Sequence, residues 1–256
     1  QAIDVLSFSV DYRHHNPIGS RKNRIDDVVF AGSWHNHKYH ERRRSALQIF
    51  DGVIDSGRNL RIIDRNWSLD NEKYLFPERY LPYVEPAIKH DELLQIHRTS
   101  DLVINLNSVV GSPTMYANRV VELQAMGCTV ISNYSAGVND QFPNVFMPDS
   151  AQETRSIIES LTPEHQYRNQ MAGLRNVFTN HVNFDRIRQL LSVCGLAEAV
   201  SPQPKLAVVG ALSTAQEFVD GQSYQDDLPV FNSVEAAREA GFDLACTVAG
   251  GFDYGQ

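Results

Sequence analysis

Short apolar runs alternate with longer segments in which apolar residues recur at helical spacing through the first 150 residues. The segments that predict strands are 28–31, 60–64, 84–88, 102–107, 128–132 and 145–147, and the helical ones between them are 39–54, 90–97 and 117–126. The strand segments are apolar throughout rather than at every second position, which is typical of parallel strands covered on both faces. The pattern predicts the α/β class, with a doubly wound parallel sheet of five or six strands.

Beyond residue 149 the pattern becomes helical and then returns to mixed α/β. Helices are expected over 150–161, 163–181 and 183–196, and a partial second α/β unit has a strand at 205–210, a helix at 234–240 and an apolar run at 242–248. We therefore expect three parts: residues 1–25 as a linker or crossover from a missing N-terminal domain, 26–196 as a Rossmann-like ligand-binding domain, and 197–256 as a linker and the start of a further α/β domain. The first residue is Gln1 rather than Met, so a fragment is expected.

Composition excludes several classes of function. The 256 residues carry 23 basic and 31 acidic side chains, a net charge of −8 that disfavours nucleic-acid binding. No apolar stretch reaches the length of a transmembrane segment, and no signal sequence opens the chain. Cys128, Cys194 and Cys246 are odd in number and lie in apolar surroundings. They are expected to be reduced, buried thiols, which indicates a cytoplasmic protein.

Candidate binding residues follow the predicted strands. Ligands of open parallel sheets bind beyond the carboxyl ends of the strands, where glycines admit close approach and helix N-termini attract anions. Gly32, Ser33, Arg65, Asn107, Pro113, Thr114 and Gly137 occupy such positions. In the helix that follows, Arg119 and Glu122 are three residues apart and share a face. Those two could equally form an ordinary surface ion pair.

The context of this helix resembles a known signature. Glu122-Leu-Gln-Ala-Met-Gly-Cys-Thr-Val-Ile131 is similar to the donor-binding motif of GT-B glycosyltransferases. The ordered segments Val29–Ser33, Glu41–Arg43 and Asn118–Glu122 resemble the CgeB-like (spore maturation protein) branch of the group 1 transferases. The likeness covers about residues 5 to 195. It implies the donor-binding half of a two-domain transferase of the polysaccharide-biosynthesis kind, using a nucleoside-diphosphate sugar as co-substrate and no other cofactor.

The resemblance also implies roles. Glu122 would accept hydrogen bonds from the ribose hydroxyls, and Arg119 or Arg65 would neutralise the leaving diphosphate; Arg119 and Glu122 are the predicted catalytic pair. The predicted substrate-binding residues are Gly32, Ser33, Arg65, Ile88 (near the base), Asn107, Pro113, Thr114, Met115, Asn118 and Gly137. The acceptor, a glycan or another molecule, and the catalytic base would belong to the absent N-terminal domain.

Two positions depart from the family pattern. Thr114 stands where many retaining members carry a second glutamate, and Thr129 replaces a proline. A non-catalytic scaffold that has lost its donor, or a sugar-nucleotide epimerase, therefore stays an alternative. A pocket filled by Met115 or Tyr116 would favour the scaffold, whereas an open pocket facing Arg119 and Glu122 would favour the enzyme.

Two other patterns concern the histidines and the C-terminal tail. Trp34–His40 holds three histidines, and His14 and His15 add two, but no cysteine or carboxylate pair completes a metal site, so no metal is predicted. One imidazole could instead contact a phosphate. The tail segments 205–210, 222–226 and 253–255 faintly resemble a GT-A transferase, without its D-x-D metal motif.

Overall fold

The computed structural model describes residues 5–69, 71–196, 205–221 and 228–249. The chain divides into two compact units, Gln1–Ala197 and Glu198–Gln256, and each is described by itself. In the described part of the chain, no helix is both long enough and apolar enough to cross a membrane.

The first unit is built on a five-stranded sheet in which every pairing is parallel, in the order β3-β2-β1-β4-β5. The strands are β1 (Ile25–Gly32), β2 (Leu60–Asp64), β3 (Val84–Pro86), β4 (Ser100–Asn105) and β5 (Thr129–Ser132). Chain order reverses direction at β1, between β2 and β4, as in a doubly wound sheet. The α/β prediction is confirmed.

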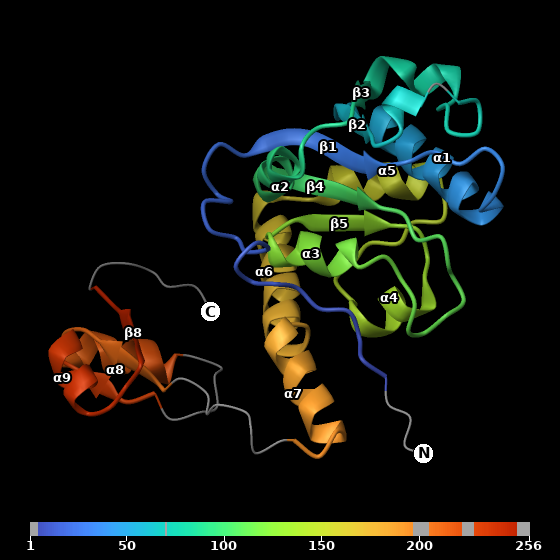
Figure 1. The fold of residues 1–256 in the computed structure, drawn as a ribbon. Coiled ribbons are helices and arrows are strands. Elements are labelled where there is room, and N and C mark those ends of the chain that lie inside the picture. Colours follow the sequence, from blue (N-terminus) through green and yellow to red (C-terminus); the bar gives the residue numbers. More distant parts are fainter. Residues whose placement is uncertain (1–4, 70, 197–204, 222–227, 250–256) are drawn as a thin grey trace. The chain divides into compact units, whose positions relative to one another are not determined.

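Helices cover both faces of this sheet (Figure 1). Helices α1 (His40–Asp55) and α5 (Ala151–Ser160) pack on one face. On the other face lie α2 (His90–Thr99), α3 (Arg119–Ala125), α4 (Ala136–Gln141) and α6 (Pro163–Asn180), the last followed by α7 (Asn183–Val193). The β2–β3 connection holds two short 3-10 helices, Trp67–Leu69 and Glu78–Tyr83.

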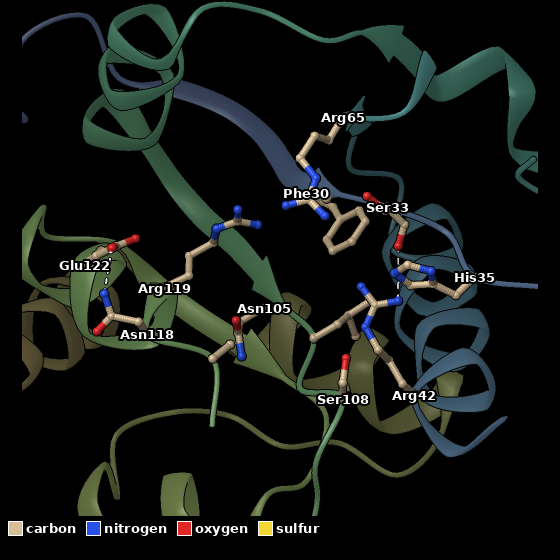
Figure 2. Close-up of a pocket in the computed structure, with 13 residues that line it drawn as sticks. Phe30, Ser33, His35, Arg42, Arg65, Asn105, Ser108, Asn118, Arg119 and Glu122 are labelled. Carbon is tan, nitrogen blue, oxygen red and sulfur yellow. Dashed lines mark hydrogen bonds between the residues drawn. The ribbon is translucent and has the colours of Figure 1, made fainter. Parts of the chain in front are cut away.

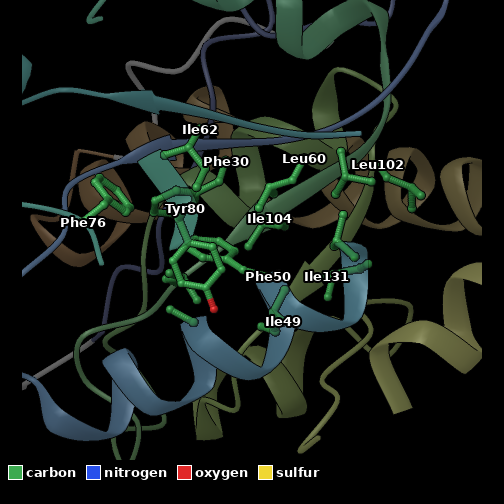
Figure 3. Packing of buried hydrophobic residues seen from close by; sticks show 14 of the residues in the cluster. Phe30, Ile49, Phe50, Leu60, Ile62, Phe76, Tyr80, Leu102, Ile104 and Ile131 are labelled. Carbon is green, nitrogen blue, oxygen red and sulfur yellow. The ribbon is translucent and has the colours of Figure 1, made fainter. Parts of the chain in front are cut away.

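Alternate residues of the strands supply two separate cores. Along β1, Val28 and Phe30 pack toward α1, whereas Val29 and Ala31 pack toward α2. Figure 3 shows the first core, where Phe30 lies against Phe50 of α1 with ring centroids 5.3 Å apart. Burial of both faces explains why the strand segments are apolar at every position.

A glycine ends α3 and directs the chain into β5. Gly127 has a left-handed φ of +79°. Its N–H donates to the Gln124 carbonyl (3.0 Å), and the Cys128 N–H donates to the Leu123 carbonyl (3.1 Å). These two bonds form a Schellman C-cap, which favours glycine because the conformation strains other residues.

Some sequence expectations need correction. Segment 145–147 is not a strand: only Phe146 forms a bridge, to Ile131 of β5. Cys128 is buried, and burial raises the pKa of its thiol to about 12, but Cys194 and Cys246 are exposed. Cys194 follows the last residue of a surface helix, and Cys246 lies on an exposed strand. Apolar neighbours in the sequence therefore do not bury either thiol.

The second unit is a smaller parallel sheet in the order β7-β6-β8. Its elements are β6 (Leu206–Val209), α8 (Leu212–Asp220), β7 (Val230–Phe231), α9 (Val234–Glu239) and β8 (Leu244–Thr247). The sequence did not predict α8. Of the three tail segments that resemble a GT-A transferase, 222–226 and 253–255 lie outside the described residues.

Candidate functional site

A pocket of about 340 Å³ opens at the carboxyl edge of the five-stranded sheet, between the ends of β1 and β4 and the start of α3 (Figure 2). This size lies within the range of small-molecule sites. Six residues singled out from the sequence line it: Gly32, Ser33, Arg65, Asn118, Arg119 and Glu122. They come from the end of β1, the residue after β2 and the first turn of α3, which the parallel topology brings together.

The end of β1 forms one wall of the pocket. A Cβ at Gly32 would lie 2.7 Å from the Phe30 ring, so glycine makes room for that ring. The Arg65 N–H donates to the Gly32 carbonyl (3.1 Å), which extends the pairing with β2 and brings Arg65 to the rim. Ser33 is 3% exposed, and its hydroxyl has no partner among the described residues.

Three arginines converge on the pocket. Arg42, from the first turn of α1, is buried and donates to the Ser33 carbonyl (3.1 Å). Arg119 donates to the Ala31 carbonyl, and Arg65 is exposed. No described carboxylate forms a salt bridge with any of the three.

The pKa of Arg42 is lowered to about 10, mainly by burial and in addition by the nearby Arg119 and Arg65. Burial also lowers the pKa of Arg119, with opposite contributions from Glu122 and Arg65. Both groups stay cationic at neutral pH, and both pKa values are lowered chiefly because the guanidinium groups are buried and secondarily because the arginines lie near one another.

Glu122 lies on the opposite side of the pocket from His35 (Figure 2). Its Oε1 accepts a hydrogen bond from Asn118 Nδ2 (2.8 Å) and lies 4.0 Å from His15 Nε2. The side chain is 29% exposed, so a ligand can reach the carboxylate. The Oδ1 atom of Asn118 is buried without a partner among the described residues.

His35 is the pocket residue that follows Ser33 and Trp34. The pKa of its imidazole is lowered to about 4, mainly by burial and in addition by the neighbouring Arg42, Lys38, His37 and Arg65 side chains. The ring is therefore neutral at pH 7, and its Nδ1 has no partner among the described residues. Buried polar atoms are usually hydrogen-bonded, and three that have no partner among the described residues, Ser33 Oγ, His35 Nδ1 and Asn118 Oδ1, belong to residues that line this pocket.

Asn107, another predicted binding residue, is fully buried and does not line the pocket. Its N–H donates to Asn133 Oδ1 (2.6 Å), and its Oδ1 accepts from the Ala117 N–H (2.8 Å). Asn107 thus joins the end of β4 to the loop after β5 and to the residues before α3. It therefore bonds the residue that precedes Asn118 and does not face the pocket.

The other predicted binding residues also lie outside the pocket lining. Ile88 packs against the core of Val29, Ala31 and Ile63. Gly137 contacts the preceding loop so closely that a Cβ would lie 2.7 Å from the Pro113 carbonyl. Thr114 and Met115 are exposed, Met115 by 55%.

The two side chains that could have filled the pocket leave it open. Tyr116 is 5% exposed, packs edge-on against Phe8 and Phe142, and donates to Gln141 Oε1 (2.9 Å). Neither it nor Met115 lines the pocket.

Sequence reasoning missed Arg42, Asn105 and Ser108, which line the pocket. The sequence did hold a signal for Arg42, because the Glu41-Arg42-Arg43 segment is one of the three that carry the family resemblance. Among the described residues, no three His, Cys, Asp or Glu side chains come together in a metal-binding group, and the histidines near Trp34 are no exception.

A family model described as "Glycosyl transferase-like" matches residues 21–192. No curated protein matches the chain by sequence. Among solved structures, a glycosyltransferase from Rickettsia africae ESF-5 is similar at 15% identity and a TM-score of 0.56, with 78% of this chain and 58% of that one covered. The α,α-trehalose 6-phosphate synthase from Burkholderia multivorans is similar at 13% identity and a TM-score of 0.51, with 76% and 51% covered. These likenesses concern the fold, and the chain spans little more than half of each structure.

Proposed function

Because this chain belongs to the glycosyl transferase-like family, we propose that its first unit binds the nucleoside-diphosphate sugar donor of a transfer reaction in the pocket at the carboxyl edge of the sheet. The acceptor would be a glycan or another hydroxyl-bearing molecule. The solved structures of similar fold support the same assignment only at the level of architecture.

The excess of positive charge in the pocket carries this proposal. Arg42, Arg65 and Arg119 face one carboxylate, Glu122, and His35 adds no charge at neutral pH. Desolvated cations without counter-ions destabilise a protein, so a site that holds them is suited to an anion. A doubly charged diphosphate would balance the two uncompensated charges and accept several charge-assisted hydrogen bonds. The unpaired Ser33 hydroxyl is a further donor for it.

Glu122 is suited to the ribose. Its carboxylate is accessible, and one of its oxygens is already oriented by Asn118. A carboxylate can accept hydrogen bonds from two adjacent hydroxyls, which a diphosphate cannot offer. The nucleotide would then extend from Glu122 past Arg119 toward Ser33.

The arginines would also assist the reaction. When the anomeric C–O bond breaks, negative charge grows on the leaving diphosphate. Guanidinium groups already held in position stabilise that charge without reorganising, which is how such sites lower a barrier. Arg119, fixed by its bond to the Ala31 carbonyl, and Arg42, fixed by Ser33, are the pre-positioned groups.

The open pocket favours donor binding over the scaffold alternative, since neither Met115 nor Tyr116 occupies it. An epimerase would need acid and base groups on both sides of the hexose. Among the described lining residues the ionisable groups other than arginine are Glu122 and His35, and Glu122 is suited to the ribose. Transfer is therefore the better supported chemistry.

Calorimetric titration with UDP-, GDP- and dTDP-sugars tests the proposal. We expect one nucleotide class to bind. Arg65→Gln should weaken that binding about 10- to 100-fold, the usual effect of losing one charge-assisted hydrogen bond. Arg65 suits the test because it is exposed and its side chain has no hydrogen bond or salt bridge with the described residues, so its loss should not disturb the fold.

Arg155→Gln is the matched control. Arg155 is an exposed arginine on α5 paired with Glu159 and is not part of the pocket. It should leave the affinity unchanged. A folded protein that takes up none of these donors at millimolar concentration, or equal losses in both variants, would contradict donor binding in this pocket.

A further inference from the structure

Four aromatic rings form a cluster that continues the pocket outward. His35 is at its centre, with ring centroids 5.9 Å from His37, 5.5 Å from Tyr39 and 5.5 Å from Tyr74; His37 and Tyr74 are 5.8 Å apart. All four pairs meet edge to face, at 72° to 88°. We call His35, His37, Tyr39 and Tyr74 the aromatic rim. Of the four, only His35 lines the pocket.

Two loops are held together to build the rim. The N–H of Asn36 donates to the Lys73 carbonyl (2.8 Å), and its side-chain amide donates to the carbonyls of Glu72 (2.8 Å) and Leu75 (3.0 Å). Asn36 Oδ1 in turn accepts from the indole N–H of Trp34 (2.7 Å), whose ring is buried. These hydrogen bonds hold the segment around Asn36 against the segment 72–75, from which Tyr74 projects.

The hydrophobic cores do not account for the rim. His37 and Tyr39 are exposed, and His35 and Tyr74 are partly exposed. None of the four belongs to a buried hydrophobic cluster of the described residues. Rings gathered at the mouth of a pocket are typical of surfaces that bind a ligand with an apolar face.

The backbone at Tyr39 gives an independent indication. Tyr39 has φ 58° and ψ 57°, a left-handed conformation that is strained for a bulky residue. Glycine or asparagine would hold this position more cheaply, yet the chain has a tyrosine there. Strain of this kind persists where a side chain is needed in a particular place.

Given the proposed donor site, the position of the aromatic rim indicates which substrate, donor or acceptor, lies against it. Glu122 and His35 lie at opposite sides of the pocket, with Arg119 and Arg65 between them (Figure 2). If Glu122 holds the ribose and the arginines hold the diphosphate, the base lies beyond Glu122 and the anomeric carbon lies toward His35. An acceptor must approach that carbon from solvent, on the side of the rim.

We propose that the aromatic rim binds a neutral sugar ring of the acceptor. A pyranose has a face of C–H groups that packs on aromatic rings, while the tyrosine hydroxyls and imidazole nitrogens can bond its hydroxyls. Lys38 covers one face of the Tyr39 ring, with its Nζ 4.8 Å from the centroid, so Tyr74 and His37 provide the principal contact surface. The choice of the acceptor as the ligand rests on the proposed donor site, whereas the test of sugar binding does not depend on it.

The test uses NMR of the aromatic side chains of the full chain, titrated with methyl glycosides of glucose, galactose and N-acetylglucosamine. Titrations are run with and without the nucleoside diphosphate that calorimetry selects. We expect the Tyr74 and His37 ring signals to shift with at least one glycoside. Tyr74→Ala should weaken that binding about 3- to 10-fold, the effect of losing one ring contact, and leave nucleotide affinity unchanged.

Tyr12→Ala is the matched control, because Tyr12 is a 41% exposed tyrosine stacked on Phe184 of α7, outside the rim. His37→Ala, an exposed position, is the second rim variant and guards against a folding defect in the first. Both rim variants should weaken sugar binding, and the control should leave it unchanged.

Two results would overturn the inference. One is the absence of any Tyr74 or His37 shift with these sugars at tens of millimolar. The other is a Tyr74 signal that responds to the nucleotide alone, with Tyr74→Ala weakening nucleotide binding instead, which would make the rim a base site. A failure of the nucleotide to bind would refute the donor site, and the glycoside titration without nucleotide would still decide the role of the rim.

Discussion

At the scale of single residues, buried histidines make stability depend on pH. His97 of α2 is 3% exposed, and its Nε2 has no partner among the described residues. Burial, followed by Arg119, His90 and His15, lowers the pKa of this imidazole to about 3. The unfolded chain, with an ordinary histidine pKa, binds the proton more readily, so stability is present above about pH 6.5 and is lost as the pH falls toward 3.

We therefore expect His97→Leu to reduce the loss of unfolding free energy between pH 7 and pH 5 by about 2 kcal/mol. Urea unfolding at both pH values measures the difference. His165→Leu, at an exposed position on α6, is the matched control. Parallel pH dependence in the wild type and His97→Leu would show that His97 does not carry this effect.

Side-chain direction explains which site residues the sequence could indicate. Arg119 and Glu122 share a helix face by their spacing, and both line the pocket. Asn107 follows the end of β4, but its side chain is buried and bonded to the loop after β5 through Asn133. A pattern of residue types cannot distinguish a side chain facing the ligand from one that supports the wall behind it. The roles of these residues stay predictions until donor binding is measured.

At the scale of elements, the strands and most helices follow from apolar periodicity, because a sheet covered on both faces leaves continuous apolar runs. Short helices are harder to predict from the sequence. Helix α4 begins in Ser135-Ala-Gly-Val, whose serine and glycine are typical of a loop. The glycine is required by close packing rather than by a turn. Segment 145–147 has strand composition but makes one bridge, since its backbone bonds at Phe146 alone join it to β5. Such differences arise from tertiary contacts.

Close packing of α1 against α5 depends on one glycine. A Cβ at Gly52 would lie 2.4 Å from the Ala151 carbonyl oxygen and 2.5 Å from Thr154 Cβ. Gly52→Ala should lower the unfolding free energy by about 1–3 kcal/mol, because the clash outweighs the roughly 1 kcal/mol that alanine gains in a helix. Since α1 carries Arg42, donor affinity should also fall.

The urea midpoint and the calorimetric affinity measure these two effects. Gly111→Ala is the matched control, because nothing lies within 4 Å of a Cβ there and the residue is in a loop without a left-handed φ. It should change stability by less than about 1 kcal/mol. Equal stability of Gly52→Ala and the wild type would mean that the helices separate at little cost.

At the scale of the whole molecule, the two units have separate cores, and the first is expected to be more stable by itself than the second. The buried clusters of the first unit contain no described residue of the second, and every residue that lines the pocket lies between Phe30 and Glu122. The second unit has two small clusters built on β6, and all four residues of β8 are exposed. A unit of that size buries little surface and is marginally stable.

A chain that ends at Ala197 should therefore fold and bind the donor with an affinity within about twofold of the full chain, since every residue that lines the pocket belongs to the first unit. Its main thermal transition should coincide with that of the full chain, which should show a second, weaker transition absent from the shortened one. Calorimetry of both proteins measures binding and unfolding together. Adding the nucleotide should raise only the shared transition, because a ligand stabilises the unit that binds it. Loss of donor binding in the shortened chain, or a nucleotide effect on both transitions, would mean that the second unit contributes to the site after all.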